Sequence, residues 1–349
     1  MPIQVFAVDD SAVMRQTLQH LLQGDREVEL AGSAPNPLIA APMIRKCVPD
    51  VLLLDIEMPG MDGLTFLRQQ MAERPIPTVI CSTLTEAGNR MALDALAAGA
   101  VAVVAKPRLG LRQFLEDSRR EIVGALKAAA RSRPRQPVMP AGGAAARPAA
   151  APPGLHALAV NKPVAIGSST GGTQAIEAVL GELPADGPGI VIVQHMPAHF
   201  TALYAKRLDG VCAMRVREAR DGDRVERGLA LIAPGGSHLQ LRKAGGQYYA
   251  QVTDGPPVNR FKPSVDVLFH SVAECAGGDA LGIILTGMGN DGARGMKRMH
   301  ERGARTVAQD EDSCVVFGMP MEAIKAGAVD EVLPLSRVAS SILHFDQRG

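Results

Sequence analysis

The chain has 349 residues, which suits two domains of ordinary size, and 46% of them are hydrophobic against 21% charged, so disorder over most of its length is excluded. Its 37 basic and 36 acidic side chains leave a formal net charge of +1, which gives the whole molecule no strong field to attract nucleic acid or anionic lipid. Aromatic residues are only 3% and Trp is absent, which argues against the stacking surfaces of single-strand nucleic-acid binders.

The first part of the chain alternates short apolar runs with segments of helical pattern. The runs lack strict alternation, which is typical of strands buried on both faces of a parallel sheet. Five strand–helix units are predicted, with strands at residues 3–8, 28–31, 51–54, 77–81 and 101–105. Pro42 falls inside the second predicted helix, which should end or kink there.

Residues 134–154 consist mainly of Pro, Ala and Gly, a composition too poor in large apolar groups to fold on its own. We expect a flexible linker over residues 127–160, between domains at 1–126 and 161–349. The second domain repeats the earlier pattern, with strands predicted at 164–166, 190–194, 230–233, 281–286 and 305–308. The fold class is therefore α/β, with two doubly wound parallel sheets.

Polar residues follow several strands of the first predicted sheet. Asp9 and Asp10 follow the first strand, Asp55 follows the third, and Ser82 and Lys106 close the fourth and fifth. Loops that leave the carboxyl ends of parallel strands converge, so three carboxylates can gather in one crevice. Such a cluster suits Mg²⁺, while a hydroxyl and a cation suit a phosphoryl group. Taken singly, each Asp could instead be a solvated loop cap.

These residues, together with residues 58–63 and Pro107, resemble a response-regulator receiver domain, a flavodoxin-like fold, over residues 1–126. The resemblance implies phosphorylation of Asp55 by a partner histidine kinase. It also implies that Mg²⁺ is held by Asp10, Asp55 and the backbone carbonyl of Glu57, with Asp9 nearby. Ser82 and Lys106 are the residues implied to sense the phosphate. Val103 stands where many receivers carry an aromatic switch residue, so aromatic rotation is not expected to transmit the signal.

A GxSxG pattern opens the second domain between a predicted strand and a predicted helix over residues 171–183. Glycines in such a turn let Ser169 project its hydroxyl, and the N–H groups at the helix start can bind an oxyanion. The pattern alone could equally mark a tight connection or an anion-binding turn. It is not a Walker loop, because Thr173 follows Gly172 where a lysine is required.

A serine nucleophile needs a base and a carboxylate. Of the eight histidines only His195 ends a clear buried strand of the same sheet, whereas His270 and His344 lie in apolar-periodic segments and are expected to pack. Asp291 follows another predicted strand and is the natural third member. Its loop also fits the GxGxxG dinucleotide pattern, with Asp310 downstream, but too few residues follow for the usual two nucleotide-binding halves.

Three segments around these residues, 167–172, 194–197 and 286–292, resemble the catalytic domain of the chemotaxis protein-glutamate methylesterases, called CheB. Residues 233–235, 262–266 and 318–320 fit the same family, whose domain is Rossmann-like. The resemblance implies hydrolysis of glutamate γ-methyl esters on methyl-accepting chemotaxis receptors, with release of methanol, and deamidation of receptor glutamines. Met288 is the implied backbone oxyanion donor, which Thr170 could supplement. No cofactor is implied for the esterase.

Both domains lie on one chain, and the resemblance implies regulation in which the receiver covers the Ser169 cleft until Asp55 is phosphorylated. Two alternatives stay open: a response regulator whose second domain only binds, and a serine esterase of small metabolites. No helix-turn-helix with a basic recognition helix supports a DNA-binding output.

Because the five cysteines form no CxxC pair, and neither a signal peptide nor a membrane span is evident, we expect a cytoplasmic protein that does not insert into membranes.

Overall fold

The computed structural model forms two compact units, Met1–Pro140 and Ala141–Gly349. It describes residues 1–58, 62–83, 85–107, 112–132 and 162–347. Most of the predicted linker lies outside these residues. The domain boundaries at 126 and 161 therefore stay predictions, although the last helix of the first unit runs to Ala130.

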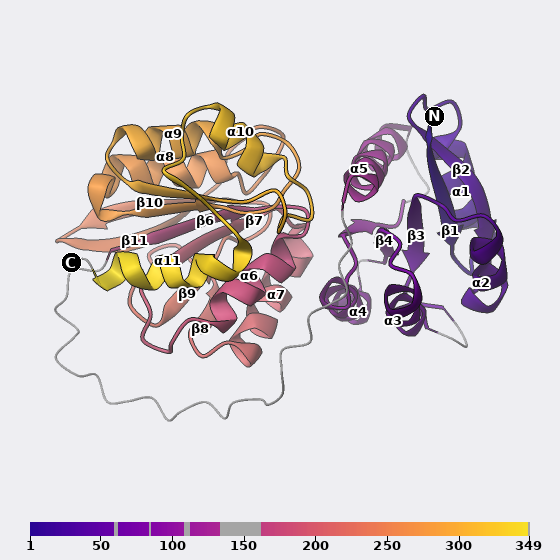
Figure 1. Ribbon diagram of the computed structural model, residues 1–349, viewed down its shortest axis with the longest axis horizontal. Helices are drawn as coiled ribbons and strands as arrows, with labels where there is room; N and C mark the ends of the chain where they lie inside the picture. The colour runs from indigo at the N-terminus through magenta and orange to yellow at the C-terminus, as the bar shows by residue number, and fades with distance from the viewer. Residues whose placement is uncertain (59–61, 84, 108–111, 133–161, 348–349) are drawn as a thin grey trace. The chain divides into compact units, whose positions relative to one another are not determined.

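The first unit is a parallel five-stranded sheet with helices wound around it (Figure 1). Its strand order is β2-β1-β3-β4-β5, which confirms the doubly wound fold. The strands are β1 (Ile3–Val8), β2 (Val28–Ala34), β3 (Val51–Asp55), β4 (Thr78–Ser82) and β5 (Ala102–Ala105). The helices are α1 (Ala12–Leu22), α2 (Pro37–Lys46), α3 (Gly63–Glu73), α4 (Glu86–Ala97) and α5 (Arg112–Ala130). Every residue of β3 is buried, which explains its uninterrupted apolar run.

Helix α2 does not end at Pro42, so that part of the prediction is wrong. Asn36 caps its start, accepting a hydrogen bond of 3.0 Å from the N–H of Ile39, and the helix continues to Lys46. Proline removes one helical hydrogen bond, but tertiary packing outweighs that local cost, since Ala40 and Ile44 are buried against the sheet side of the helix.

The second unit contains a parallel seven-stranded sheet in the order β14-β13-β12-β6-β7-β9-β8. Its strands are β6 (Val164–Ser168), β7 (Ile190–Gln194), β8 (Arg215–Glu218), β9 (Leu229–Ile232), β12 (Leu281–Ile284), β13 (Arg305–Gln309) and β14 (Glu331–Leu333). The helices are α6 (Gly172–Gly181), α7 (Ala198–Val211), α8 (Val265–Cys275), α9 (Ala293–Glu301), α10 (Met319–Lys325) and α11 (Leu335–Gln347). This confirms the second predicted parallel sheet.

An antiparallel hairpin, β10 (His238–Ala244) and β11 (Gln247–Thr253), was not predicted. Its two-residue turn is Gly245-Gly246, with φ of 54° and 75°, and a Gly-Gly pair between alternating residues is a hairpin signal that could have revealed it. The hairpin packs on α8, and its apolar side chains Leu239, Leu241 and Tyr248 are buried in the core of the unit.

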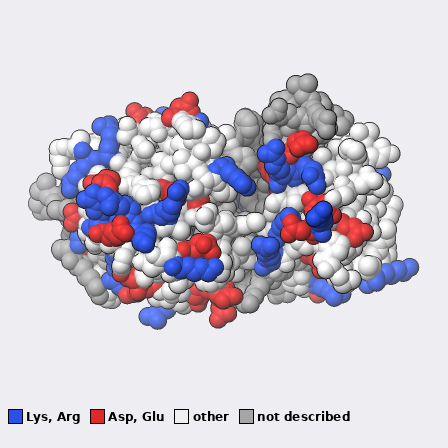
Figure 2. Space-filling view, turned by 90° about the horizontal axis from the view of Figure 1, so that it is seen from above, with Lys and Arg blue, Asp and Glu red and all other residues white. Residues whose placement is uncertain are grey.

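Charged side chains of both signs are interspersed on the face drawn in Figure 2, as a net charge near zero implies. Within the described ranges, no helix is long and apolar enough to cross a membrane.

We expect Gly63→Ala to destabilise the first unit by about 1–3 kcal/mol, the usual range for overpacking. A Cβ at residue 63 would lie 2.1 Å from the carbonyl oxygen of Asp55 and 2.7 Å from the Cα of Ile56, and backbone atoms cannot move aside easily. The matched control is Gly124→Ala in α5, where a Cβ meets nothing within 4 Å and helix propensity should raise stability by about 0.5–1 kcal/mol. Urea unfolding of the full chain measures both, and equal stabilities would contradict the packing argument.

Candidate active site

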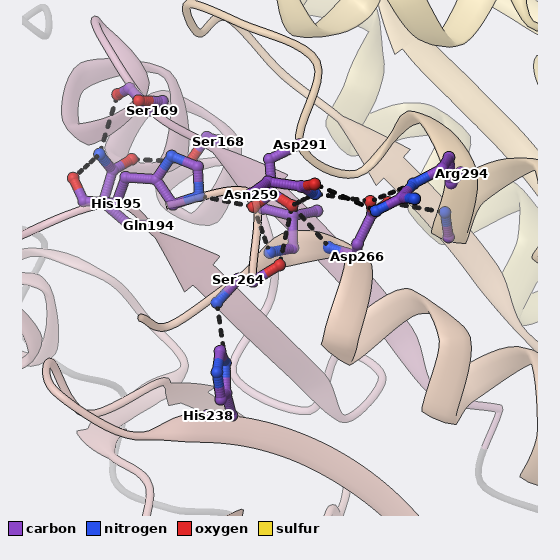
Figure 3. A network of polar contacts seen from close by, with 12 residues as sticks. Ser168, Ser169, Gln194, His195, His238, Asn259, Ser264, Asp266, Asp291 and Arg294 are labelled. Carbon is purple, nitrogen blue, oxygen red and sulfur yellow. Dashed lines mark hydrogen bonds and ion pairs between the residues drawn. The ribbon is translucent and has the colours of Figure 1, made fainter. Parts of the chain in front are cut away.

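Strands β6 and β7 deliver the predicted nucleophile and base to the same edge of the second sheet. The parallel register pairs Ser168 with Gln194, so the next residues, Ser169 and His195, leave adjacent strand ends together. The N–H of His195 donates to the carbonyl oxygen of Ser168 at 3.1 Å, which extends this pairing by one residue. Figure 3 shows the resulting cluster of polar side chains.

Gln194 ties the two strand ends to each other. Its Nε2 donates to the carbonyl oxygens of Ser169 at 2.8 Å and of His195 at 3.0 Å. Its Oε1 accepts a hydrogen bond of 2.7 Å from Ser168 Oγ. A buried amide that uses both of its ends in this way fixes the backbone on both sides of the site. The sequence alone shows Gln194 only as part of a motif and does not reveal this role.

The turn after Ser169 requires glycine. Gly171 has φ of 77°, and a Cβ at Gly172 would lie 2.2 Å from Gln194 Oε1. Helix α6 begins at Gly172, so the strand turns directly into a helix, as a nucleophile elbow does. The N–H of Ser169 donates to the carbonyl oxygen of Thr286 at 3.0 Å, which joins the elbow to the end of β12.

His195 and Asp291 form a buried pair. His195 Nε2 lies 2.8 Å from Asp291 Oδ2, and the histidine side chain is only 6% exposed. Phe261 stacks on the imidazole, with ring centroids 3.7 Å apart and planes 6° apart. Nδ1 is the ring nitrogen left over, and within the described part of the chain it is buried with no hydrogen-bond partner. Ser169 Oγ likewise has no partner there, and a catalytic hydrogen bond of this kind often forms only with substrate present.

The Asp291 carboxylate accepts five hydrogen bonds and is fully buried. Oδ2 accepts from His195 and, at 2.7 Å, from the N–H of Val265, the first residue of α8. The donors to Oδ1 are the side chains of Asn259 (2.7 Å) and Ser264 (2.8 Å) and the N–H of Asp266 (3.3 Å). Burial alone would raise the pKa of Asp291, but the hydrogen bonds lower it to about 2. The group therefore stays ionised at any working pH.

Two of these supporting side chains had no assigned role in the sequence. Ser264 lies in a segment that fitted the family pattern, but only the structure shows its hydroxyl on Asp291. Asn259 lies outside every quoted motif. His238, which is buried, accepts a 3.2 Å hydrogen bond at Nδ1 from the N–H of Ser264 and so holds that residue in place.

The packing roles expected for His270 and His344 are wrong, because both side chains are exposed. Each lies on a helix whose apolar residues face the core, but the histidine itself lies on the solvent-exposed face of that helix. Neither competes with His195 as a base for Ser169.

The loop after β12 runs against Ser169, the predicted nucleophile. A Cβ at Gly287 would lie 2.8 Å from the Cβ of Ser169, so only glycine allows this approach. The neighbouring residue, Met288, is half-buried. Among the residues that the structure describes, the backbone N–H groups of Met288 and Thr170 have no acceptor, so both are available to a bound oxygen.

In the first unit, the three predicted carboxylates come together at the ends of β1 and β3. Asp9, Asp10 and Asp55 each offer an oxygen, and these atoms all lie within 4.8 Å of one another. Asp9 and Asp55 are buried, whereas Asp10 is exposed and leaves the cluster open to solvent. Lys106 Nζ lies 2.6 Å from Asp55 Oδ2 and 3.2 Å from Asp9 Oδ2. Hard carboxylate oxygens in this arrangement fit Mg²⁺.

The electrostatics of this pocket favour a cation. Burial raises the pKa of Asp9, Lys106 opposes the rise, and the nearby charge of Asp55 adds to it. Burial works against the charged form of Lys106, but its bonds to Asp55 and Asp9 leave the pKa raised. One lysine thus offsets only part of three acidic charges.

The remaining predicted residues border this pocket. Ser82 is buried at the end of β4. The N–H of Glu57 donates to Asp55 Oδ1 at 3.0 Å. The side-chain carboxylate of Glu57 accepts hydrogen bonds from Thr83 and Thr85. Residues 59–61 of the quoted motif lie outside the described residues. The structure thus brings Asp9, Asp10, Asp55 and Lys106 together, with Ser82 and Glu57 on neighbouring strand ends.

Each unit of the fold matches a known protein family. The CheB methylesterase family matches residues 164–342, and the response regulator receiver domain matches residues 5–116. A protein-glutamate methylesterase/protein-glutamine glutaminase of Dechloromonas aromatica is 55% identical, covering 98% of each chain, and one of Chromobacterium violaceum is 54% identical, covering 97% of this chain and 98% of its own. The crystal structure of the Thermotoga maritima CheB methylesterase catalytic domain is 38% identical, with a TM-score of 0.52, over 53% of this chain and 98% of that one.

The two full-length relatives align with nearly the whole chain at more than half identity. The two family matches each fall within one unit of the fold. The chain therefore belongs to the CheB methylesterase family, the protein-glutamate methylesterases/protein-glutamine glutaminases that carry a response regulator receiver domain.

Proposed function

We propose that this enzyme hydrolyses γ-methyl esters of glutamate on methyl-accepting chemotaxis receptors, in the cytoplasm, with Ser169, His195 and Asp291 as a catalytic triad. The observation that carries the proposal is the buried Asp291–His195 pair beside the elbow that presents Ser169. A serine on a glycine turn is common, but a serine beside a buried imidazole that is itself bonded to an ionised carboxylate is specific to nucleophilic catalysis.

In the first half of the reaction, Ser169 Oγ attacks the ester carbonyl carbon and its proton passes to His195 Nδ1. Asp291 keeps the Nε2 proton in place and stabilises the charged imidazole. The imidazolium then returns the Nδ1 proton to the departing methoxy group, and methanol leaves. In the trypsin-type triad the two ring nitrogens have the opposite assignment, and the roles are otherwise the same.

In the second half, a water molecule attacks the glutamyl-serine ester while His195 Nδ1 takes one of its protons. That proton goes to Ser169 Oγ as the acyl bond breaks, which leaves the free serine and a glutamic acid side chain. The acid then loses the second proton of the water to solvent and becomes the glutamate carboxylate. The negative oxygen of each tetrahedral intermediate is stabilised by the backbone N–H groups of Met288 and Thr170. With a glutamine side chain as substrate, the same steps release ammonia, so the proposal includes deamidation.

The receiver unit, proposed as residues 1–126 and followed by a linker to residue 160, controls this activity. A histidine kinase supplies the phosphoryl group, which Asp55 accepts. Asp10, Asp55 and the carbonyl of Glu57 would hold Mg²⁺, which neutralises charge on the phosphoryl oxygens. Lys106 and Ser82 then bind the phosphoryl group, so Lys106 gives up its present contact with the free carboxylate. That change biases the receiver toward the state in which the esterase is active.

Ser169→Ala should lower methanol release from methylated receptor membranes by at least about 10³-fold, because the nucleophile of the acyl-enzyme is lost. The control is Ser340→Ala, an exposed serine on α11 whose hydroxyl only bonds to its own helix, and its rate should equal that of the wild type. Substantial turnover by Ser169→Ala would refute the nucleophile assignment.

Replacing Asp291 should change how stability depends on pH. Since the folded-state pKa of Asp291 is lowered to about 2 from 3.8, its contribution is complete above about pH 4 and is lost as the pH falls toward 2. The shift corresponds to about 2 kcal/mol. Scanning calorimetry between pH 5 and 2 should show the stability advantage of the wild type over Asp291→Asn shrinking by that amount. A difference that stays constant with pH would contradict the lowered pKa.

A small phosphodonor with Mg²⁺ should raise methanol release by the full chain about 5- to 150-fold, the range for a coupling of about 1–3 kcal/mol. Asp55→Ala should abolish the increase, because the phosphoryl acceptor is gone. Asp50→Ala, which removes an exposed carboxylate of the same unit, is the control and should respond like the wild type. An equal increase in Asp55→Ala would refute regulation through this residue.

A further inference from the structure

We infer that residues 258–261, here called the 258–261 turn, hold His195 and Asp291 in their working orientation through the side chains of Asn259 and Phe261. The inference rests on the proposed triad. Both side chains are positioning residues: Phe261 packs on the imidazole, Asn259 bonds to the carboxylate, and neither forms or breaks a bond in the reaction.

The backbone of the turn is tight and held at both ends. The N–H of Val258 donates to the carbonyl oxygen of Phe261 at 3.0 Å, and the reverse bond is 2.9 Å. Between them, Asn259 has φ of 52° and Arg260 has φ of 74°. Two central residues with positive φ are typical of a type I′ turn. Asparagine tolerates this region, whereas arginine rarely adopts it, and such conformations persist only where the surroundings hold them.

Asn259 fixes the carboxylate side of the pair. Its Nδ2 donates to Asp291 Oδ1 and to Asp266 Oδ2, both at 2.7 Å. Its own Oδ1 accepts a hydrogen bond of 3.0 Å from Arg294. Both ends of the amide are therefore engaged, so the side chain cannot rotate without breaking bonds to two carboxylates (Figure 3).

Phe261 fixes the imidazole side. A hydrogen bond from Nε2 to Asp291 sets the direction in which the ring points, but it leaves the ring free to tilt about that bond. The parallel stack of Phe261, at 3.7 Å and 6°, removes the tilt and keeps water from one face of the ring. The two contacts together aim Nδ1, which is the nitrogen that must take the serine proton.

The spacing of the turn explains why one short segment can make both contacts. Asn259 and Phe261 are two residues apart, and the intervening Arg260 is exposed at the tip. Because the two ends are bonded to each other, displacement of one side chain moves the other. A turn that served only to connect β11 to α8 would need neither an amide on Asp291 nor a ring on His195.

The test uses the full chain and measures kcat and KM for methanol release from methylated receptor membranes. Phe261→Leu should lower kcat about 10- to 100-fold with KM changed less than about twofold, because a small misplacement of a catalytic group costs up to about 10²-fold. Phe261→Tyr, which keeps the stacked ring, should recover most of the loss. Asn259→Gly should lower kcat about 10-fold or more, because glycine accepts the positive φ and only the amide is lost.

A control variant separates positioning from general packing. Phe345→Leu makes the same change at a buried phenylalanine of α11 and should retain the kcat of the wild type. Nitrogen NMR of the His195 ring in its neutral form should show a single tautomer with the proton on Nε2 in the wild type, and a mixture in Phe261→Leu and Asn259→Gly. If Phe261→Leu does not fold, Asn259→Gly carries both measurements.

Ser169→Ala, measured alongside, separates failure of this inference from failure of the proposed function. Wild-type kcat and a single tautomer in both Asn259→Gly and Phe261→Leu, with Ser169→Ala inactive, would overturn the positioning role and leave the triad intact. An active Ser169→Ala would overturn the triad and the positioning role with it.

Discussion

The ionised, fully buried carboxylate of Asp291 is the constraint on which the arrangement of the second unit depends. A charge without water must be matched by hydrogen bonds, and here five donors supply them. Those donors come from the residue after β7, from the segment before α8 and from the first turn of α8, so the carboxylate joins parts of the chain that are far apart in sequence. Removing it would leave several buried donors without an acceptor. The same group that fixes the imidazole therefore also fixes the local fold.

Both units use the same structural device for different chemistry. In a parallel sheet the carboxyl ends of the strands meet at one edge, and each unit gathers its reactive side chains there. In the first unit the edge collects three carboxylates and a lysine, and the surplus of negative charge suits a cation and a phosphoryl group. In the second unit the edge collects a hydroxyl, an imidazole and one carboxylate whose charge is satisfied by protein donors. The difference is that protein donors balance the charge in the second unit, whereas the first unit keeps a surplus of negative charge that suits a cation.

The sequence predicted the features that depend on strands, because strand ends are visible in apolar runs. Asp55 and Lys106 in the first unit follow such runs, as do Ser169, His195 and Asp291 in the second. Within each unit the parallel topology then brings the strand ends together. It could not predict Asn259 or Phe261, which lie in an irregular segment and reach the site only through a turn. Helix α2 shows that a local signal can also mislead. Proline usually ends a helix, but α2 continues through Pro42 because the helix is buried against its sheet. The edge strand β8 escaped notice because its exposed arginines interrupt the apolar pattern.

The central claim is that the Asp291–His195 pair activates Ser169. Its most direct test is the rate at which a fluorophosphonate, which reacts only with an activated serine, modifies the full chain, with the site located by mass spectrometry. We expect a single modified residue, Ser169, and a rate that falls by about 10²- to 10⁴-fold in Asp291→Asn, in which the shape of the carboxylate is kept but its charge is lost. Modification of another serine, or an unchanged rate in Asp291→Asn, would contradict it.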